Sequence, residues 1–278
     1  MSPKKRDLFA GDIQLNEENH TYHVKEYPHL KWTSATTFIG EYFDPFNTEK
    51  IAGKLADSPN RKYGHMSKEE VLQQWEDFAN TGTAIHEELE NWIKVVIMGN
   101  KEEIPIQYDK TQHGIDWLNE NIEPHFKLYP EVKIYSLPLQ LAGTIDLLIH
   151  NPKIDKWVMV DWKTNNKIRT GSYKNKKGLK NATKYLDNCN YNKYQLQMSL
   201  YQWILKEEYG VDILRRGLIH LKPKKTRYYP LGVKEYWTDY LRHNIEMMVE
   251  DRAKQRKEGK LFNPLPIRKK ANNKQKKT

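Results

Sequence analysis

The 278-residue chain has a single cysteine, Cys189, and no apolar run that approaches the roughly 20 residues a membrane-spanning helix needs. One cysteine excludes an intramolecular disulfide, an all-cysteine zinc site and a four-cysteine iron–sulfur cluster. The opening stretch MSPKKRDLFAGD has basic residues but no apolar segment after them, which disfavours a secretory signal. We therefore expect a polar protein of a reducing compartment, the cytoplasm, that has no membrane partner.

Acidic residues are missing from three basic segments, residues 1–6, 162–186 and 268–278. The chain has 46 Lys and Arg against 36 Asp and Glu, a net charge of +10, and these segments hold 17 of the positive charges. The remainder is therefore acidic, with 29 positive charges against 36 negative. Concentrated positive charge suits a polyanionic partner such as nucleic acid. The alternative for the terminal segments is a solvated tail, and we expect residues 263–278 to be disordered.

Helical periodicity dominates the first half of the chain, whereas short β-rich runs appear after residue 130. The expected elements of the first half are a hairpin (20–33), two short helices (34–57), a helix with Ser67 as N-cap (67–80), a long amphipathic helix (83–98) and another helix (109–127). Those of the second half are strands (131–137, 139–149 and 156–164), a helix (191–209), strands (213–221 and 226–231) and a final helix (233–258). This order predicts an α/β core, residues 82–262, after a mainly helical N-terminal extension, residues 1–81.

Two of the expected strands carry acids away from their apolar faces, because side chains alternate along a strand. Asp161 and Lys163 share the face opposite Val158, Val160 and Trp162. Asp146 lies opposite an apolar set made of Leu139, Leu141, Ile145, Leu147 and Ile149.

A hairpin centred near Pro152-Lys153 gives a register in which the numbers of paired residues add to about 305–307. Asp146 then faces Asp161 directly, at roughly 5 Å, or diagonally, at about 7–8 Å. Either spacing lets the two carboxylates share a divalent cation, which would also relieve their repulsion. The alternative is an ordinary surface ion pair between Asp161 and Lys163.

Four segments, in order, resemble the motifs of the PD-(D/E)XK nucleases, specifically their RecB-like exonuclease branch. They are GTAIHEELE from Gly82, AGTID from Ala142, DWKT from Asp161 and QMSLY from Gln197. The chain before Gly82 is more loosely similar to phage-encoded and mitochondrial-genome-maintenance-type exonucleases. The resemblance implies a restriction-endonuclease-like core, a mixed central sheet flanked by helices. It also implies hydrolysis of DNA, with single-stranded ends preferred.

The resemblance also assigns roles to residues. With one or two Mg²⁺ or Mn²⁺ ions, Asp146, Asp161 and the carbonyl of Trp162 would be metal ligands, and His86 would bind the second cation. Lys163 would orient or help deprotonate the attacking water. Gln197 and Tyr201 would position the substrate. In the third motif Asp161 stands where many relatives have Glu, and the shorter side chain puts the metal geometry in doubt. The iron–sulfur cluster of some relatives is absent because its cysteines are missing.

Several features support or extend these assignments. His86 and Glu90 are four residues apart and share a helical face, and the alternative for His86 is a simple pairing with Glu90. Glu90 and Glu131 are second-tier candidates for orienting or contacting metal. Thr164 and Lys167 begin the basic segment 162–186, whose lysines and tyrosines favour contact with a nucleic-acid strand, with a solvated insertion as the alternative.

Three readings of the function stay open. The leading one is a metal-dependent DNA exonuclease, and an endonuclease of the same fold is the nearest alternative. A nucleic-acid-binding protein without catalysis would use the basic segments alone. Nothing in the residues singles out a protein-interaction role for the acidic remainder.

Overall fold

The computed structural model describes residues 5–59, 62–97, 99 and 104–259. The predicted basic tail, residues 263–278, lies outside these described residues. A hairpin of β1 (Ile13–Asn16) and β2 (Thr21–Val24) opens the described chain. After β3 (Thr33–Ser34) come three helices: α1 (Ala35–Gly40), α2 (Thr48–Ala56) and the 30-residue α3 (Lys68–Ile97). The N-terminal part thus has the mainly helical character that the sequence predicts.

The core follows in the order α4 (Asp109–Asn121), β4 (Lys127–Ser136), β5 (Leu141–Asn151) and β6 (Lys156–Lys163). Next come α5 (Asn190–Ile204), extended by a wider turn over Leu205–Tyr209, then β7 (Ile213–Leu221), β8 (Val233–Trp237) and α6 (Arg242–Lys257). Among the described residues, six strands form one mixed sheet in the order β3-β5-β6-β7-β8, with β4 paired to β5. The β6–β7 pair is parallel, and β4, β5 and β6 form an antiparallel meander.

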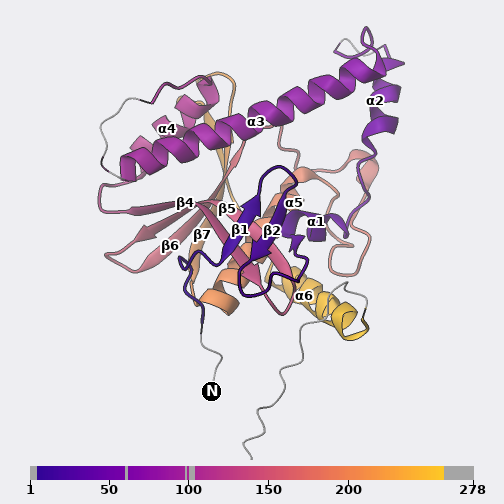
Figure 1. The fold of residues 1–278 in the computed structure, drawn as a ribbon. Helices are drawn as coiled ribbons and strands as arrows, with labels where there is room; N and C mark the ends of the chain where they lie inside the picture. Colours follow the sequence, from indigo (N-terminus) through magenta and orange to yellow (C-terminus); the bar gives the residue numbers. More distant parts are fainter. Residues whose placement is uncertain (1–4, 60–61, 98, 100–103, 260–278) are drawn as a thin grey trace, which may run out of the picture.

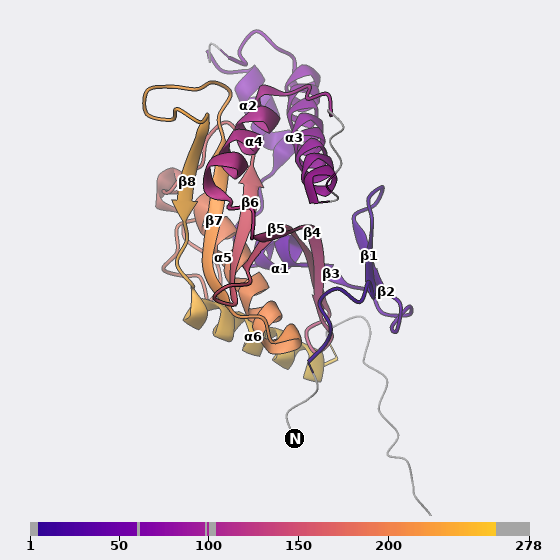
Figure 2. The same cartoon turned by 90° about the vertical axis from the view of Figure 1, so that its left-hand side faces the viewer.

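Helices cover both faces of this sheet (Figures 1 and 2). On one face, α3 and α4 bury Ile85, Leu89 and Trp117 against strand residues such as Leu147 and Val160. On the other face, α1, α5 and α6 pack in a larger cluster with residues such as Leu141 and Met159. The α/β fold, a mixed sheet flanked by helices after a helical segment, is therefore confirmed.

Helix α3 corrects the prediction of two successive helices divided near Asn80. It runs unbroken through Gly82, although glycine weakens a helix interior. A Cβ at Gly82 would lie 2.9 Å from Oγ1 of Thr164, just after β6. The glycine therefore permits a close approach of α3 to the end of β6 rather than a break.

Three other boundaries differ from the prediction. The hairpin occupies residues 13–24 instead of 20–33, and α4 ends at Asn121. Residues 233–237, expected in the final helix, form β8, while 226–231 lie outside any strand. Val233–Trp237 pairs antiparallel with the free edge of β7, and that tertiary pairing outweighs helical periodicity.

The β5–β6 hairpin has the predicted register, because Leu147 pairs with Val160. The predicted single apolar face of β5 is wrong, however. Leu141 and Ile145 pack with α1 and α5, whereas Leu147 and Ile149 pack with α3 and α4. The face changes at Asp146, where the β4–β5 ladder skips Glu131, a residue with a positive φ of 51°.

Candidate functional site

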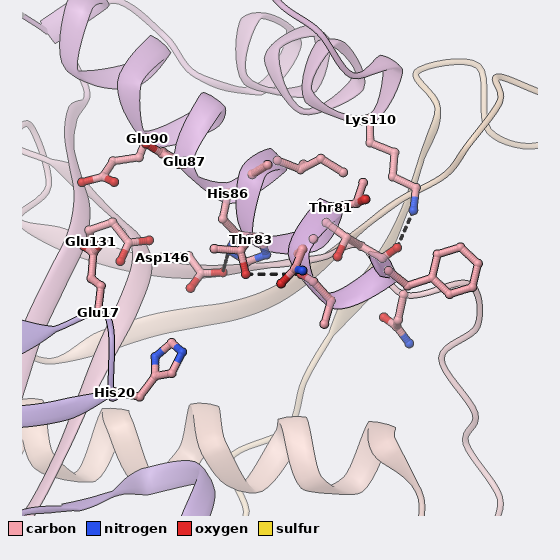
Figure 3. A pocket seen from close by; sticks show the side chains of 18 of the residues that line it. Glu17, His20, Thr81, Thr83, His86, Glu87, Glu90, Lys110, Glu131 and Asp146 are labelled. Atoms are coloured by element: carbon pink, nitrogen blue, oxygen red, sulfur yellow. Dashed lines mark hydrogen bonds and ion pairs between the residues drawn. The ribbon is translucent and has the colours of Figure 1, made fainter. Parts of the chain in front are cut away.

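A cleft of about 1310 Å³ opens beside the point where β5 changes face. Helix α3 forms one wall from Trp75 to Lys94, and the β1–β2 hairpin forms part of the other with Leu15, Glu17 and His20. Glu131 and Asp146 line the cleft from the sheet, and residues 164–166 line it after β6. Figure 3 shows His86, Glu90, Glu131 and Asp146 gathered in this space, with His20 of the hairpin across from them.

His86, Glu131 and Asp146 come from three different elements, α3, β4 and β5, yet they meet at one point. One ligand atom from each lies within 4.8 Å of the others, and Nδ1 of His86 is 3.4 Å from Oδ2 of Asp146. The left-handed backbone of Glu131 sets it opposite Asp146 at the interruption of the β4–β5 ladder. We call these three residues the ligand cluster.

The electrostatics of the ligand cluster favour a cation. Burial raises the pKa of Glu131, and the neighbouring charges of Asp146 and Glu90 raise it further, while Lys133 and Lys94 oppose the shift. Two carboxylates and an imidazole, half-buried and converging, fit a divalent ion such as Mg²⁺ or Mn²⁺. Such an ion would offset the crowding of like charge that raises the pKa of Glu131.

Asp161 and Lys163 form a second unit, deeper in the protein. Asp161 is 3% exposed and forms an ion pair with Lys163, whose Nζ lies 4.3 Å from the centre of the Tyr194 ring on α5. Burial raises the pKa of Asp161, and Asp146 adds to the rise, while Lys163 and His86 oppose it. Burial alone would lower the pKa of Lys163, but Asp161 and Asp146 hold it above its usual value.

Asp146 connects the two units. Its Oδ2 accepts a hydrogen bond of 2.8 Å from the backbone N–H of Trp162, the residue between Asp161 and Lys163. The indole of Trp162 lies in the core, edge-on to Trp117 at 5.7 Å between ring centres. The structure therefore brings Asp146, Asp161 and Lys163 together as the spacing predicts, with Asp161 turned to Lys163 rather than into the ligand cluster. The roles of Asp161 and of the Trp162 carbonyl as ligands stay predictions.

Gln197 and Tyr201 lie behind β5 and are not among the residues that line the cleft. Nε2 of Gln197 donates to the Tyr201 hydroxyl at 3.2 Å, and Tyr201 is 3% exposed. The Tyr201 ring fills the space that a side chain at Gly143 would need. In this arrangement the two residues support the strand that carries Asp146, and a direct contact with substrate stays a prediction.

The second-tier and basic-segment candidates also divide into residues that line the cleft and residues that do not. Glu90 lines the cleft and forms an ion pair of 2.5 Å with Lys94, not with His86. Thr164 also lines the cleft, whereas Lys167 is exposed outside it. Within the basic segment, Lys176 pairs with Asp44 at 2.9 Å and Lys177 pairs with Asp187 at 2.7 Å. Part of its charge is thus neutralised by the protein itself.

Lys110 is a residue of the cleft that the motifs do not reveal. It comes from α4, and its Nζ donates to the carbonyl of Thr164 (Figure 3). Burial lowers its pKa, and the nearby Lys222 lowers it further. A lysine held in this way offers positive charge to an anionic strand in the cleft, and only the folding of α4 against the end of β6 places it there.

The aromatic residues of the N-terminal part are mostly internal. Phe38, Tyr42 and Phe43 are at most 2% exposed, and Tyr22, Tyr27 and Trp32 pack around a small third core cluster. Phe9, Phe46 and Phe78 are the phenylalanines of this part that face solvent, at 50%, 64% and 49% exposure.

A protein-family model matches the core of the chain. The family model described as the PD-(D/E)XK nuclease superfamily matches residues 61–259, more than half of the chain. No curated protein matches the chain. Within the described residues, no helix combines the length and the apolar composition needed to cross a membrane.

Proposed function

The chain belongs to the PD-(D/E)XK nuclease superfamily, and on that basis we propose that it is an exonuclease that degrades single-stranded DNA from an end. Membership implies cleavage of nucleic acid with divalent metal ions. The observation that carries the proposal is the ligand cluster, set in a cleft between α3 and the β1–β2 hairpin. The similarity of the four motifs to RecB-like exonucleases supports the preference for an end.

His86, Glu131 and Asp146 would hold the metal, because their donor atoms converge and their combined charge attracts a cation. When bound, a divalent cation supplies Lewis-acid chemistry that activates water and stabilises charge on the phosphate. Asp161 and Lys163 lie immediately behind Asp146, so that Lys163 supplies a fixed positive charge and Asp161 holds it in place. Lys110, at the Thr164 end of the cleft, would attract the phosphates of the strand.

The enclosure of the cleft supports a single strand as substrate. The hairpin residues Glu17 and His20 face the ligand cluster across the cleft (Figure 3), so substrate must enter between two walls. A flexible unpaired strand adapts to such a path more readily than a stiff duplex, whose persistence length is about 150 base pairs.

The test is digestion of linear DNA strands labelled at either end, in Mg²⁺ or Mn²⁺, beside a closed single-stranded circle, a duplex and an RNA strand. We expect progressive shortening of the linear DNA strand from one end and an intact circle. Cutting of the circle would show an endonuclease, and faster digestion of RNA or duplex would overturn the proposed substrate.

Variants of the site give a second readout. Asp146→Asn and Lys163→Ala should each reduce cleavage by more than roughly 100-fold while binding of the strand in EDTA is largely kept. Asp212→Asn, in which the altered side chain is 71% exposed, is the matched control and should cleave normally. Full cleavage by both site variants would instead favour a protein that binds nucleic acid through its basic segments and owes any nuclease activity to another site.

A further inference from the structure

Four aromatic side chains, Phe46, Tyr63, Trp75 and Phe78, gather around the N-terminal half of α3. The ring centre of Trp75 lies 5.9 Å from that of Phe46 and 6.3 Å from that of Tyr63. Nε1 of Trp75 also donates to the Tyr63 hydroxyl at 3.3 Å. Tyr63, Trp75 and Phe78 line the same cleft as the ligand cluster. We call these four residues the aromatic cluster.

The aromatic cluster is not part of the protein core. None of its members belongs to the three buried clusters formed by the described residues. Phe46 and Phe78 are 64% and 49% exposed, although nearby Phe43 is 2% exposed. Single exposed apolar residues are common, but neighbouring aromatic rings in contact and open to a cleft are typical of a binding surface.

The helical register sets the aromatic cluster and the ligand cluster on one wall. Trp75, Phe78, Gly82 and His86 follow each other at intervals of three or four residues, so they share one face of α3. With a rise of about 1.5 Å per residue, Phe78 lies about 12 Å along the helix axis from His86. A chain that follows this wall meets the aromatic rings first and the ligand cluster next, or the reverse.

The charge around the rings suits an anion. Nζ of Lys62 lies 4.8 Å from the ring centre of Tyr63 and 5.1 Å from that of Phe78. Glu76 and Asp77, on the same helix, are exposed but do not line the cleft. Flat rings combined with a lysine are the surface that unpaired nucleic acid uses, because its bases stack and its phosphates seek positive charge.

We propose that the aromatic cluster stacks on unpaired bases of the DNA strand whose phosphodiester backbone reaches the ligand cluster. The inference rests on the proposed function and adds a physical source for the preference for single strands. Bases in a duplex are already stacked and paired, so they present no free faces to Phe78 or Trp75. An apolar partner protein is the competing occupant, and the test below separates the two.

The test measures binding of a fluorescent oligothymidylate to the full-length protein in EDTA, which prevents cleavage. Phe78→Leu keeps an apolar side chain but removes the ring, and it should bind about 5- to 30-fold more weakly. Tyr228→Leu, at a residue 84% exposed and not among those that line the cleft, is the matched control and should bind as the parent does. Thermal melting of each variant shows that it has folded.

A strand with abasic sites supplies the second arm. The parent protein should bind it more weakly than the intact strand, and Phe78→Leu should bind both strands alike, because the stacking contact is already lost. Equal binding of the two strands by the parent would overturn the inference and favour an apolar protein partner. Parent-like binding of the intact strand by Phe78→Leu would overturn it too.

Failure of the inference is distinct from failure of the proposed function. A parent protein that degrades single strands while Phe78→Leu binds normally contradicts the stacking role alone. A parent protein that neither binds nor cleaves any strand contradicts both.

Discussion

Asp146 and Asp161 stand on neighbouring strands of one hairpin, but their surroundings differ. Asp161 is buried and its charge is matched within the protein by Lys163. Asp146 is 14% exposed at its side chain, shares its space with Glu131 and has only the imidazole of His86 as a nearby partner in the ligand cluster. The protein thus balances the charge of one half of the site internally, whereas the other half keeps converging carboxylates that we propose bind a cation.

The difference in burial and pairing gives the two halves of the site separate tasks, a distinction that the sequence motif does not reveal. A buried ion pair is costly to break because it leaves an unpaired charge in a medium that solvates it poorly. A crowded group of carboxylates is strained until a cation arrives, so its stability depends on the metal. On the proposed function, the Asp161–Lys163 half supports the site with or without metal, whereas the ligand cluster is completed by the cation.

The largest expected effect comes from breaking the internal pair. Lys163→Met leaves Asp161 buried without its cation and should lower the free energy of unfolding by about 3–5 kcal/mol in a urea titration. Lys206→Met removes a lysine from the exposed pair with Asp212 and should change the free energy of unfolding by at most about 0.5 kcal/mol. The double variant Asp161→Asn with Lys163→Met should recover much of the loss. Equal losses in Lys206→Met and Lys163→Met would show that the buried pair is no more important to stability than an exposed one.

An intermediate effect is expected at the ligand cluster, with the opposite sign. Glu131→Gln removes one of the crowded carboxylates, so in EDTA it should raise the free energy of unfolding by about 1–2 kcal/mol. That corresponds to a melting temperature higher by about 2–8 °C. The gain in melting temperature on adding Mn²⁺ should shrink at the same time.

Glu123→Gln is the control for Glu131, because its side chain is 68% exposed and lies outside the cleft. It should leave both the metal-free stability and the response to Mn²⁺ unchanged. A metal-free Glu131→Gln protein no more stable than the parent would show that the carboxylates do not strain the empty fold.

The smallest expected effect is on the pH dependence of stability. It involves His220, which contacts the loop that follows Lys163. His220 is 1% exposed and its Nε2 lies 2.5 Å from the carbonyl oxygen of Asn165, which lines the cleft. Burial lowers the pKa of His220 to about 4, and Lys222, Lys110 and Lys234 lower it too, against the hydrogen bond to Asn165. The folded protein thus keeps His220 neutral, whereas the unfolded chain protonates it below about pH 6.5.

Stability from this histidine is therefore present above pH 6.5 and is lost as the pH falls toward 4. Between pH 6.5 and pH 5 we expect the parent to lose about 1 kcal/mol more stability than His220→Gln in urea titrations, because the other titrating groups are common to both proteins. His243→Gln, at an exposed histidine of α6, is the control and should keep the slope of the parent. An unchanged slope in His220→Gln would show that the loop does not depend on a neutral His220.

Much of the Asp161–Lys163 half of the site could be predicted from local pattern. The turn chemistry around Pro152 sets the β5–β6 register, and that register alone brings Asp146 close to Asp161 and Lys163. Gly82 shows the limit of such reasoning. A glycine between two amphipathic stretches favours a break, and only the packing of α3 against Thr164 shows that the helix continues.

Glu131 shows more clearly what local sequence patterns cannot predict. Its sequence neighbourhood predicts a strand residue of secondary importance, because a positive φ at a glutamate has no local signature. The pairing of β4 with β5 sets that backbone opposite Asp146 and so completes the ligand cluster with His86. The aromatic cluster could not be predicted from local sequence either, because Phe46 and Tyr63 reach Trp75 of α3 only through the tertiary fold.

The sequence by itself determined the fold class, the order of the motifs and the register of the hairpin that carries two acids and a lysine. These follow from short-range physics, namely the period of apolar residues, turn chemistry and strand alternation. The tertiary structure alone decided which acids converge with His86, which acid is neutralised by lysine, and where rings remain open to the cleft. Those outcomes depend on burial and on contacts between distant segments, and no local pattern encodes them.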